Sequence, residues 1–446
     1  MSDADIQQQE NNLSGLVASV LYFAEKQGAS DSEVSISNGT GLSLTVRKQD
    51  VETIEFHRDQ SMSVTVYFGQ RKGSASSSDL NQNSVEETIM KACSLAKYGA
   101  EDEFSGLADS DRMARECLDL DLYHPWGLNP QEAIELASVC EASALGFDKR
   151  INNSEGASVN SYEGISFYGN SHGFLAGYPE SQHSLTCAVL AGAGGEMQRD
   201  YEYTVARDPA DLDTADKIGK GAAEKTIRRL GASKLTTRIS PVIYPAYLAR
   251  GLFGHAVNAL SGGALYRKAS FLLDQLDKQI FPKNIKIDEL PHLPKGISSA
   301  PFDNEGVATE DRELINQGVL KGYFLGSYYA RKLGMESTGN AGGIHNLIVN
   351  HTGDSYKDLL QRMNTGFLVT ELMGQGVNIV NGDYSRGATG FWIENGEIIR
   401  PVNEVTLAGN LREMYLDIIS IANDLDHRGG IRTGSVLIDK MTVAGN

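Results

Sequence analysis

The feature that most constrains the fold is a series of segments early in the chain in which apolar and polar residues alternate. Four of them lie between residues 33 and 68: "EVSIS", "LSLTVRK", "VETIEF" and "MSVTVYF". Alternation puts the apolar side chains on one face of a strand, so one face of the sheet is covered and the other is solvated. Consecutive strands of this kind favour an antiparallel or mixed sheet. Gly39 and Gly41 are predicted to mark the first turn.

Helical patterns surround these strands. Leu13, Val17, Val20 and Ala24 repeat at helical spacing, and Gly28 ends the run. Beyond the first strands, the sequence predicts helices at about 84–98, 130–145 and 211–230, and strands at 158–169, 173–181 and 184–192. Strands and helices in this order predict an α+β domain, in which helices form a layer on one face of a sheet.

The second half of the chain is rich in glycine and short β patterns. The turn "ENGE" (394–397) joins two strand patterns, and Asn-Gly suits a type I′ hairpin. A helix is predicted at about 411–423. We expect a mostly β, barrel-like domain here, after a connector at 231–239. The 446 residues are therefore predicted to form an N-terminal α+β domain, residues 1–235, and a C-terminal β-rich domain, residues 236–446.

Charge and composition narrow the class of function. The formal net charge of -18 argues against a broad electrostatic grip on nucleic acid or anionic lipid. The N-terminal "MSDADIQQQENN" is too polar for a secretory signal, and no long apolar run predicts a membrane span. None of the four cysteines lies in a CxxC pair, and Cys93 and Cys140 fall on helical patterns typical of buried thiols. We therefore expect a cytoplasmic protein.

A single histidine, His255, lies in the predicted helix "AYLARGLFGHAV" (246–257). A zinc hydrolase needs three or four converging ligands and a carboxylate that acts as general base. Arg250 and Gly251 precede His255 on the helix, but glycine has no ligand atom and arginine would repel the ion. Residues five apart on a straight helix also point about 140° away from each other. We predict neither a confident catalytic residue nor a metal ligand in this chain.

The glycine-dense segments suggest a different activity. Glycines allow close backbone approach, and an extended peptide can add itself to an open sheet edge as a strand. The alternative is that these glycines only turn a crowded barrel. The predicted peptide-binding residues are Gly254, His255, Gly342, Gly343, His345, Gly374, Gly376 and Arg386.

Several segments together resemble the TldD/PmbA family of zinc metallopeptidases. They include "GLFGHAVNALSGGALYRKASFLLD", "STGNAGGIHN", "VTELMGQGVN", "GDYSRGATGFWIENGEI" and "PVNEVTLAGNL", with "RKGSASSSDL" and "YGNSHG" in the first half. The resemblance covers essentially the whole chain. It implies a cytosolic peptidase built from two kinds of subunit, one of which carries a helical H-E-x-x-x-H motif and a cysteine ligand near its C-terminus.

This sequence departs from that motif. The matching window, residues 250–255, retains only its last histidine, His255. The matching C-terminal segment, "HRGGIRTGSVLI" (427–438), has Thr433 and Gly434 where a cysteine is sought. The resemblance therefore implies a zinc-free subunit that binds and positions peptides or unfolded segments, while a TldD-like partner supplies the zinc site. A homodimer is possible when the chain is isolated.

Two other functions stay open at this point. The chain could be a stand-alone metalloprotease in which His255 is joined by His345 or His427 and by a carboxylate such as Glu371 or Asp383. It could instead be a non-enzymatic regulatory protein that contacts another protein rather than DNA.

Overall fold

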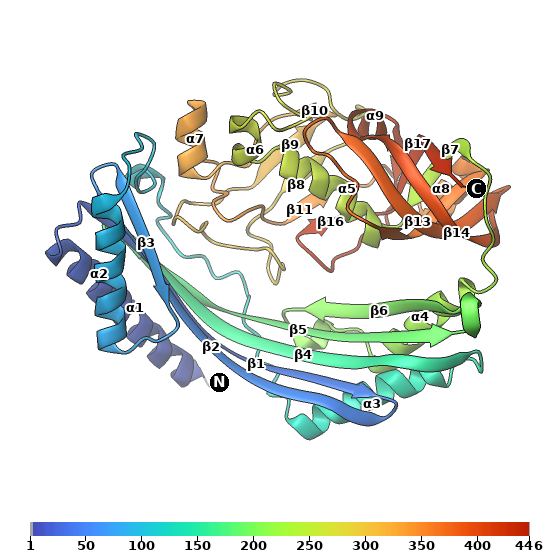
Figure 1. The fold of residues 1–446 in the computed structure, drawn as a ribbon, viewed down its shortest axis with the longest axis horizontal. Helices are drawn as coiled ribbons and strands as arrows, with labels where there is room; N and C mark the ends of the chain where they lie inside the picture. Colours follow the sequence, from blue (N-terminus) through green and yellow to red (C-terminus); the bar gives the residue numbers. More distant parts are fainter. Residues whose placement is uncertain (1–2, 446) are drawn as a thin grey trace.

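The computed structural model describes the backbone of residues 3–445, and the side chains in this range other than those at positions 3–5 and 195. A long, curved antiparallel sheet dominates the N-terminal half (Figure 1). Its strand order is β3-β2-β1-β4-β5-β6. The strands are β1 (Asp31–Arg47), β2 (Asp50–Phe68), β3 (Arg71–Ser77), β4 (Ile151–Asn170), β5 (Leu175–Ala191) and β6 (Gln198–Ala206).

Four helices cover one face of this sheet. They are α1 (Asp3–Lys26), α2 (Gln82–Tyr98), α3 (Pro130–Leu145) and α4 (Ala215–Arg228). Along β1, Val34 and Ile36 pack in one core with α1 and α2, whereas Leu44 and Val46 pack in a second core with α3 and α4. The alternation seen in the sequence therefore marks the covered face, as predicted. Cys93 and Cys140 are buried thiols in these two cores.

The predicted turn at Gly39 and Gly41 is wrong, because both glycines lie inside β1. A Cβ added to Gly39 would come within 2.5 Å of the Tyr162 hydroxyl, and one added to Gly41 would come within 2.9 Å of the His57 ring. The glycines thus make room for rings from the neighbouring strands. β1 instead reverses at Lys48 and Gln49, whose φ values are 53° and 65°.

Strand continuity also differs from the prediction. The four early segments form only two strands, β1 and β2, and the three segments between 158 and 192 form only β4 and β5. β3 was not predicted. Its residues, "RKGSASS", are small and polar, but they pair with Met62–Phe68 of β2. Long strands persist here because each has a hydrogen-bonding neighbour along its length.

The C-terminal half contains two further sheets. One has the order β10-β9-β8-β11-β16; the other, β14-β13-β12-β7-β17-β15, closes on itself because β14 also pairs with β17. The five strands β7, β12, β13, β14 and β17 make a barrel, which confirms the predicted α+β class with a barrel-like second half. The first sheet contains β8 (Ile287–Glu289), β9 (Arg312–Asn316), β10 (Val319–Leu320), β11 (Leu347–Val349) and β16 (Ile431–Arg432). The second contains β7 (Arg238–Tyr244), β12 (Gly366–Met373), β13 (Asp383–Glu394), β14 (Glu397–Asn410), β15 (Ile418–Ile421) and β17 (Val436–Ala444).

The C-terminal helices are short. They are α5 (Ala246–Ala259), α6 (Gly262–Tyr266), α7 (Ser327–Leu333), α8 (Tyr356–Met363) and α9 (Leu411–Leu416). The predicted helix at 411–423 is wrong beyond Leu416, because the isoleucine-rich run after it forms β15 and pairs with β17. The Asn-Gly hairpin is confirmed, since Asn395 and Gly396 both have positive φ, 54° and 74°. The division at residue 235 stays a prediction.

Candidate functional site

The histidine helix, α5, follows β7 directly and packs on the barrel. Ala249, Leu252, Phe253 and Ala256 are buried on its inner face. The helix is unbroken from Ala246 to Ala259 in spite of its two internal glycines. Arg250 and His255 therefore point to different surroundings, as expected for residues five apart on a straight helix.

His255 lies among aromatic and cationic groups. Its ring is 6.1 Å from the ring of Tyr384 in an edge-on arrangement. Burial lowers the pKa of His255, and the positive charge of Arg386 lowers it further. The Tyr384 hydroxyl is in turn 3.3 Å from that of Tyr244. The surroundings of the imidazole therefore disfavour its charged form.

The structure brings five of the eight predicted peptide-binding residues together. Arg386, beside His255, donates through Nε to the carbonyl oxygen of Gly374 at 3.1 Å. The neighbouring Ser385 N–H donates to the carbonyl oxygen of Gly376 at 2.6 Å. Gly254 precedes His255 on α5 and has room for a Cβ, which would lie 3.8 Å from Ile431 Cδ1. These residues form one group at the junction of α5, β12 and β13.

The remaining predicted residues, Gly342, Gly343 and His345, lie in a separate loop with its own contacts. His345 donates through its N–H to Glu289 at 2.9 Å, and its Nε2 is 2.8 Å from the carbonyl oxygen of Gly339. Gly342 has a φ of 99°. Within residues 3–445 this loop shares no hydrogen bond or ring contact with His255 or Arg386, and its visible contacts hold the loop in place.

The residues near His255 do not suit a zinc ion. The described part of the chain contains no group of three or more His, Cys, Asp or Glu side chains placed to hold a metal. Glu371, a candidate base for a stand-alone protease, pairs with Arg229, and Asp383 accepts from the Asn381 and Asn410 side chains. A site bordered by guanidinium groups repels a divalent cation.

The C-terminal segment implied by the resemblance does lie against α5. Arg250 donates through Nη1 to the carbonyl oxygen of Arg428 at 3.3 Å. Thr433 is buried, and its hydroxyl donates to the carbonyl oxygen of Gly434 at 3.0 Å. A Cβ on Gly434 would come within 1.8 Å of the Ala422 carbonyl oxygen, so only glycine fits. The two segments are neighbours, although α5 retains only His255 of the expected ligands and the C-terminal segment has no cysteine.

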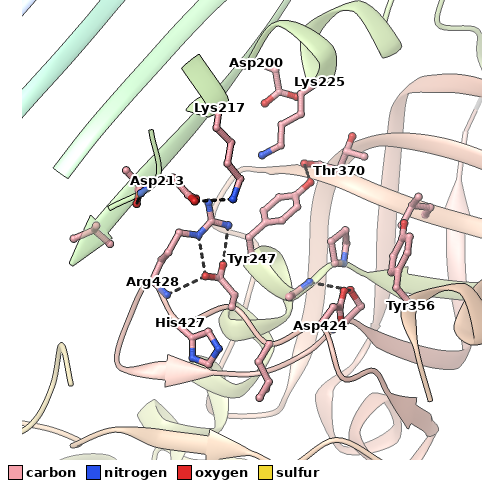
Figure 2. A pocket seen from close by; sticks show the side chains of 18 of the residues that line it. Asp200, Asp213, Lys217, Lys225, Tyr247, Tyr356, Thr370, Asp424, His427 and Arg428 are labelled. Carbon is pink, nitrogen blue, oxygen red and sulfur yellow. Dashed lines mark hydrogen bonds and ion pairs between the residues drawn. The ribbon is translucent and has the colours of Figure 1, made fainter. Parts of the chain in front are cut away.

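A cleft opens beside this contact, between the N-terminal sheet and the barrel. Its volume is about 670 Å³, and its walls come from β6, α4, the start of α5, β12 and residues 424–428. Figure 2 shows Lys217 extending toward Arg428, and Lys225 extending toward the ring of Tyr247. A smaller cavity of about 180 Å³ shares residues with the cleft and reaches Arg250. The smaller cavity therefore connects the cleft to the first position of the altered motif.

Ion pairs fix most of the charges in the cleft. Arg428 binds Asp426 at 2.9 Å and Glu202 at 2.7 Å, and Lys225 binds Glu202 at 2.8 Å. Burial opposes ionisation of Glu202, but Lys225 and Arg428 outweigh it, so the pKa of Glu202 lies below its ordinary value. Burial likewise opposes ionisation of Asp426, and Arg428 outweighs it and lowers the pKa. Both carboxylates are therefore charged near neutral pH, and both are already engaged in ion pairs with Lys225 or Arg428.

Sequence reasoning missed this cleft. Its contributions from β6 and α4 lie in the first half of the chain, where no chemistry was predicted. The one feature of the sequence that could have indicated the cleft is β6, "QRDYEYTVA". This strand is rich in charged and aromatic residues rather than in the β-branched residues typical of strands. Of the cleft residues, only His427 was considered, and it is exposed on the loop wall.

Comparison with known proteins decides the family. Residues 32–96, 123–230 and 236–445 match, in order, domain 1, the central domain and the C-terminal domain of the PmbA/TldA metallopeptidases. The chain is 48% identical to "Metalloprotease PmbA" of Escherichia coli O157:H7 over 443 residues, which are 99% of this chain and 98% of that protein. The chain belongs to the PmbA/TldD metallopeptidase family.

Two solved structures share the whole fold of this chain. A candidate modulator of DNA gyrase from Bacteroides thetaiotaomicron superposes with a TM-score of 0.92 at 30% identity, covering 97% of this chain and 98% of that one. TldE from Thermococcus kodakarensis superposes with a TM-score of 0.86 at 21% identity, covering 96% of this chain and all of that one. Among residues 3–445, each helix is too short or too polar to cross a bilayer.

Proposed function

We propose that this chain is the peptide-binding, zinc-free subunit of a TldD/PmbA-type metallopeptidase. In this proposal a TldD-like partner contributes the zinc ion and the general base, and the pair cleaves peptides or unfolded protein segments. The chain itself binds the peptide and holds it in an extended form. The pair is cytoplasmic, and the isolated chain can pair with a second copy of itself.

One observation carries this proposal. A cleft of about 670 Å³ begins at the first residues of α5, Ala246 and Tyr247, and the cavity of about 180 Å³ that adjoins it is lined by Arg250, which stands at the position of a metal ligand. The walls of the cleft carry Tyr247 and Tyr356 together with charged groups, a mixture typical of sites that bind flexible polar chains. The geometry supports binding by this chain and chemistry by another.

Metal analysis combined with a cleavage assay tests the proposal. Zinc content and hydrolysis of an unfolded protein substrate are measured for the chain alone, for a TldD-like protein alone and for the mixture. We expect zinc and hydrolysis only where the TldD-like protein is present, and faster hydrolysis in the mixture. Stoichiometric zinc in the isolated chain, together with hydrolysis, would replace this proposal with the stand-alone protease.

A second experiment addresses the regulatory alternative. The tagged chain is expressed in its native cell and its stable partners are identified after purification. A TldD-like protein among them supports the proposal. If another protein binds stably and no TldD-like protein is found, the chain acts as a regulator instead.

A further inference from the structure

The small cavity beside α5 contains one cation that differs from the rest. Five positively charged residues line this cavity of about 180 Å³: Arg199, Lys225, Arg229, Arg250 and Arg428. Four of them have a carboxylate partner within 4.0 Å. Arg199 pairs with Glu155 at 2.6 Å. Lys225 and Arg428 both pair with Glu202, and Arg229 pairs with Asp200 and Glu371.

Arg250 has no such partner among the described residues. Among residues 3–445, the only hydrogen bond of its side chain runs from Nη1 to the carbonyl oxygen of Arg428, at 3.3 Å. The Asp426 carboxylate senses the charge of Arg250 but is already held by Nε and Nη2 of Arg428. The Nε and Nη2 atoms of Arg250 therefore remain available. That edge of a guanidinium is the one that binds a carboxylate through two parallel hydrogen bonds.

The rest of the cavity suits the end of a peptide. Leu248 and Leu372 provide apolar wall, and Tyr203 and Tyr247 provide aromatic wall. The Tyr203 hydroxyl is buried and has no hydrogen-bond partner in the described structure. A cavity of about 180 Å³ is much smaller than the several hundred Å³ of a drug-sized site. It has room for about one residue and its carboxylate.

We propose that Arg250 binds a carboxylate of the peptide in this cavity. The motif position that holds a metal ligand in the partner type would thus hold an anion-binding guanidinium in this subunit. This inference rests on the proposed function, because it requires that the chain bind peptide at all. The carboxylate belongs either to the C-terminus of the peptide or to an Asp or Glu side chain, since the chemistry of recognition is the same.

Three fluorescent peptides that differ only in charge distinguish these cases. One is a short Gly/Ser/Ala/Leu peptide with a free C-terminal carboxylate; the second is its C-terminal amide; the third is that amide with one Ser replaced by Glu. Binding to the full chain is measured by fluorescence anisotropy at low ionic strength, where charge pairs are least screened. We expect at least one carboxylate peptide to bind about tenfold more tightly than the neutral amide. Preference for the free acid assigns the C-terminus, and preference for the Glu peptide assigns a side chain.

Variants connect the preference to Arg250. Arg250→Gln should abolish it, and Arg250→Lys should retain part of it, because lysine keeps the charge but not the paired N–H groups. Arg150→Gln is the matched control: it removes one positive charge at an exposed ion pair with Asp148, away from the cleft, and should leave the preference unchanged. Equal melting temperatures would show that each variant is folded.

Two results would overturn the inference, and they are distinguishable. If the wild-type chain binds all three peptides equally, or if Arg250→Gln keeps the preference, carboxylate recognition by Arg250 is wrong while peptide binding stands. If none of the peptides binds to the chain, alone or mixed with a TldD-like protein, the proposed function fails as well.

Discussion

The guanidinium of Arg229, which follows α4, forms an ion pair with the carboxylate of Glu371 on β12. The same guanidinium pairs with Asp200 on β6 at 3.2 Å. One side chain thus connects the N-terminal sheet, its last helix and the C-terminal barrel. These residues also line the small cavity, so the ion pairs fix the two sides of that cavity relative to each other.

Removing Arg229 should therefore destabilise the fold. The Arg229 side chain is 11% exposed and that of Asp200 14% exposed, so Arg229→Ala leaves a mostly buried carboxylate without its partner. We expect a loss of about 2–3 kcal/mol in the free energy of unfolding, measured by urea denaturation. Lys220→Ala breaks an exposed pair with Asp216 and should change the same quantity by less than about 0.5 kcal/mol. Equal effects of the two variants would contradict the role given to Arg229.

Gly73 should tolerate no side chain. It lies in β3 where α2 crosses the strand, and a Cβ would come within 2.2 Å of the Ala92 carbonyl oxygen and 2.4 Å of the Ala96 nitrogen. Both atoms belong to the helix backbone, so Gly73→Ala must push α2 away from the sheet. We expect a loss of about 3 kcal/mol. Gly15, on the exposed side of α1, has nothing within 4 Å. Gly15→Ala should instead stabilise by about 0.5–1 kcal/mol, and thermal unfolding of both variants checks the contrast.

His255 should make stability depend on pH. Its folded pKa is lowered, so below the ordinary histidine pKa of about 6.5 the unfolded chain binds a proton that the folded chain resists. The contribution of His255 to the free energy of unfolding is therefore fully present above that pH and is lost as the pH falls. In urea unfolding between about pH 7.5 and pH 5.5, His255→Gln should show a shallower loss of stability than wild type. His427→Gln, an exposed cleft position, should keep the wild-type slope because His255 is still present.

Gly251 should accept alanine without loss of activity. It is exposed on α5, and a Cβ there would meet nothing within 4 Å. Gly251→Ala should therefore raise the free energy of unfolding by up to about 1 kcal/mol through better helix propensity. Hydrolysis by the mixture with a TldD-like protein should be unchanged, since no general base stands at this position. A folded Gly251→Ala variant that abolishes hydrolysis would show that this surface has a role the structure does not reveal.

Local features were predictable from sequence because neighbouring residues decide them. The Asn395–Gly396 turn needs two residues with positive φ, and the sequence supplies the pair best suited to it. The alternation along β1 fixed which face meets the helices. The departure from the H-E-x-x-x-H pattern is a property of the sequence itself, because positions 250 and 251 hold arginine and glycine.

Strand ends and turns were less predictable where packing overrides local preference. Gly39 and Gly41 are typical turn residues, but here they lie under rings from Tyr162 and His57 on adjacent strands. The chain after Leu416 has a helical pattern, but β17 offers it a pairing edge. In both cases a neighbour distant in sequence decided the outcome.

By itself, then, the sequence determined the fold class, the covered face of the first sheet and the absence of a zinc-binding motif on α5. Only the tertiary structure decided that Arg250 lines a small cavity, that its charged neighbours are already paired, and that three of the seven predicted glycine and histidine positions belong to another loop. The reason is separation along the chain: Arg229 and Glu371 are 142 residues apart, and such contacts depend on how whole elements pack rather than on any pattern within one of them.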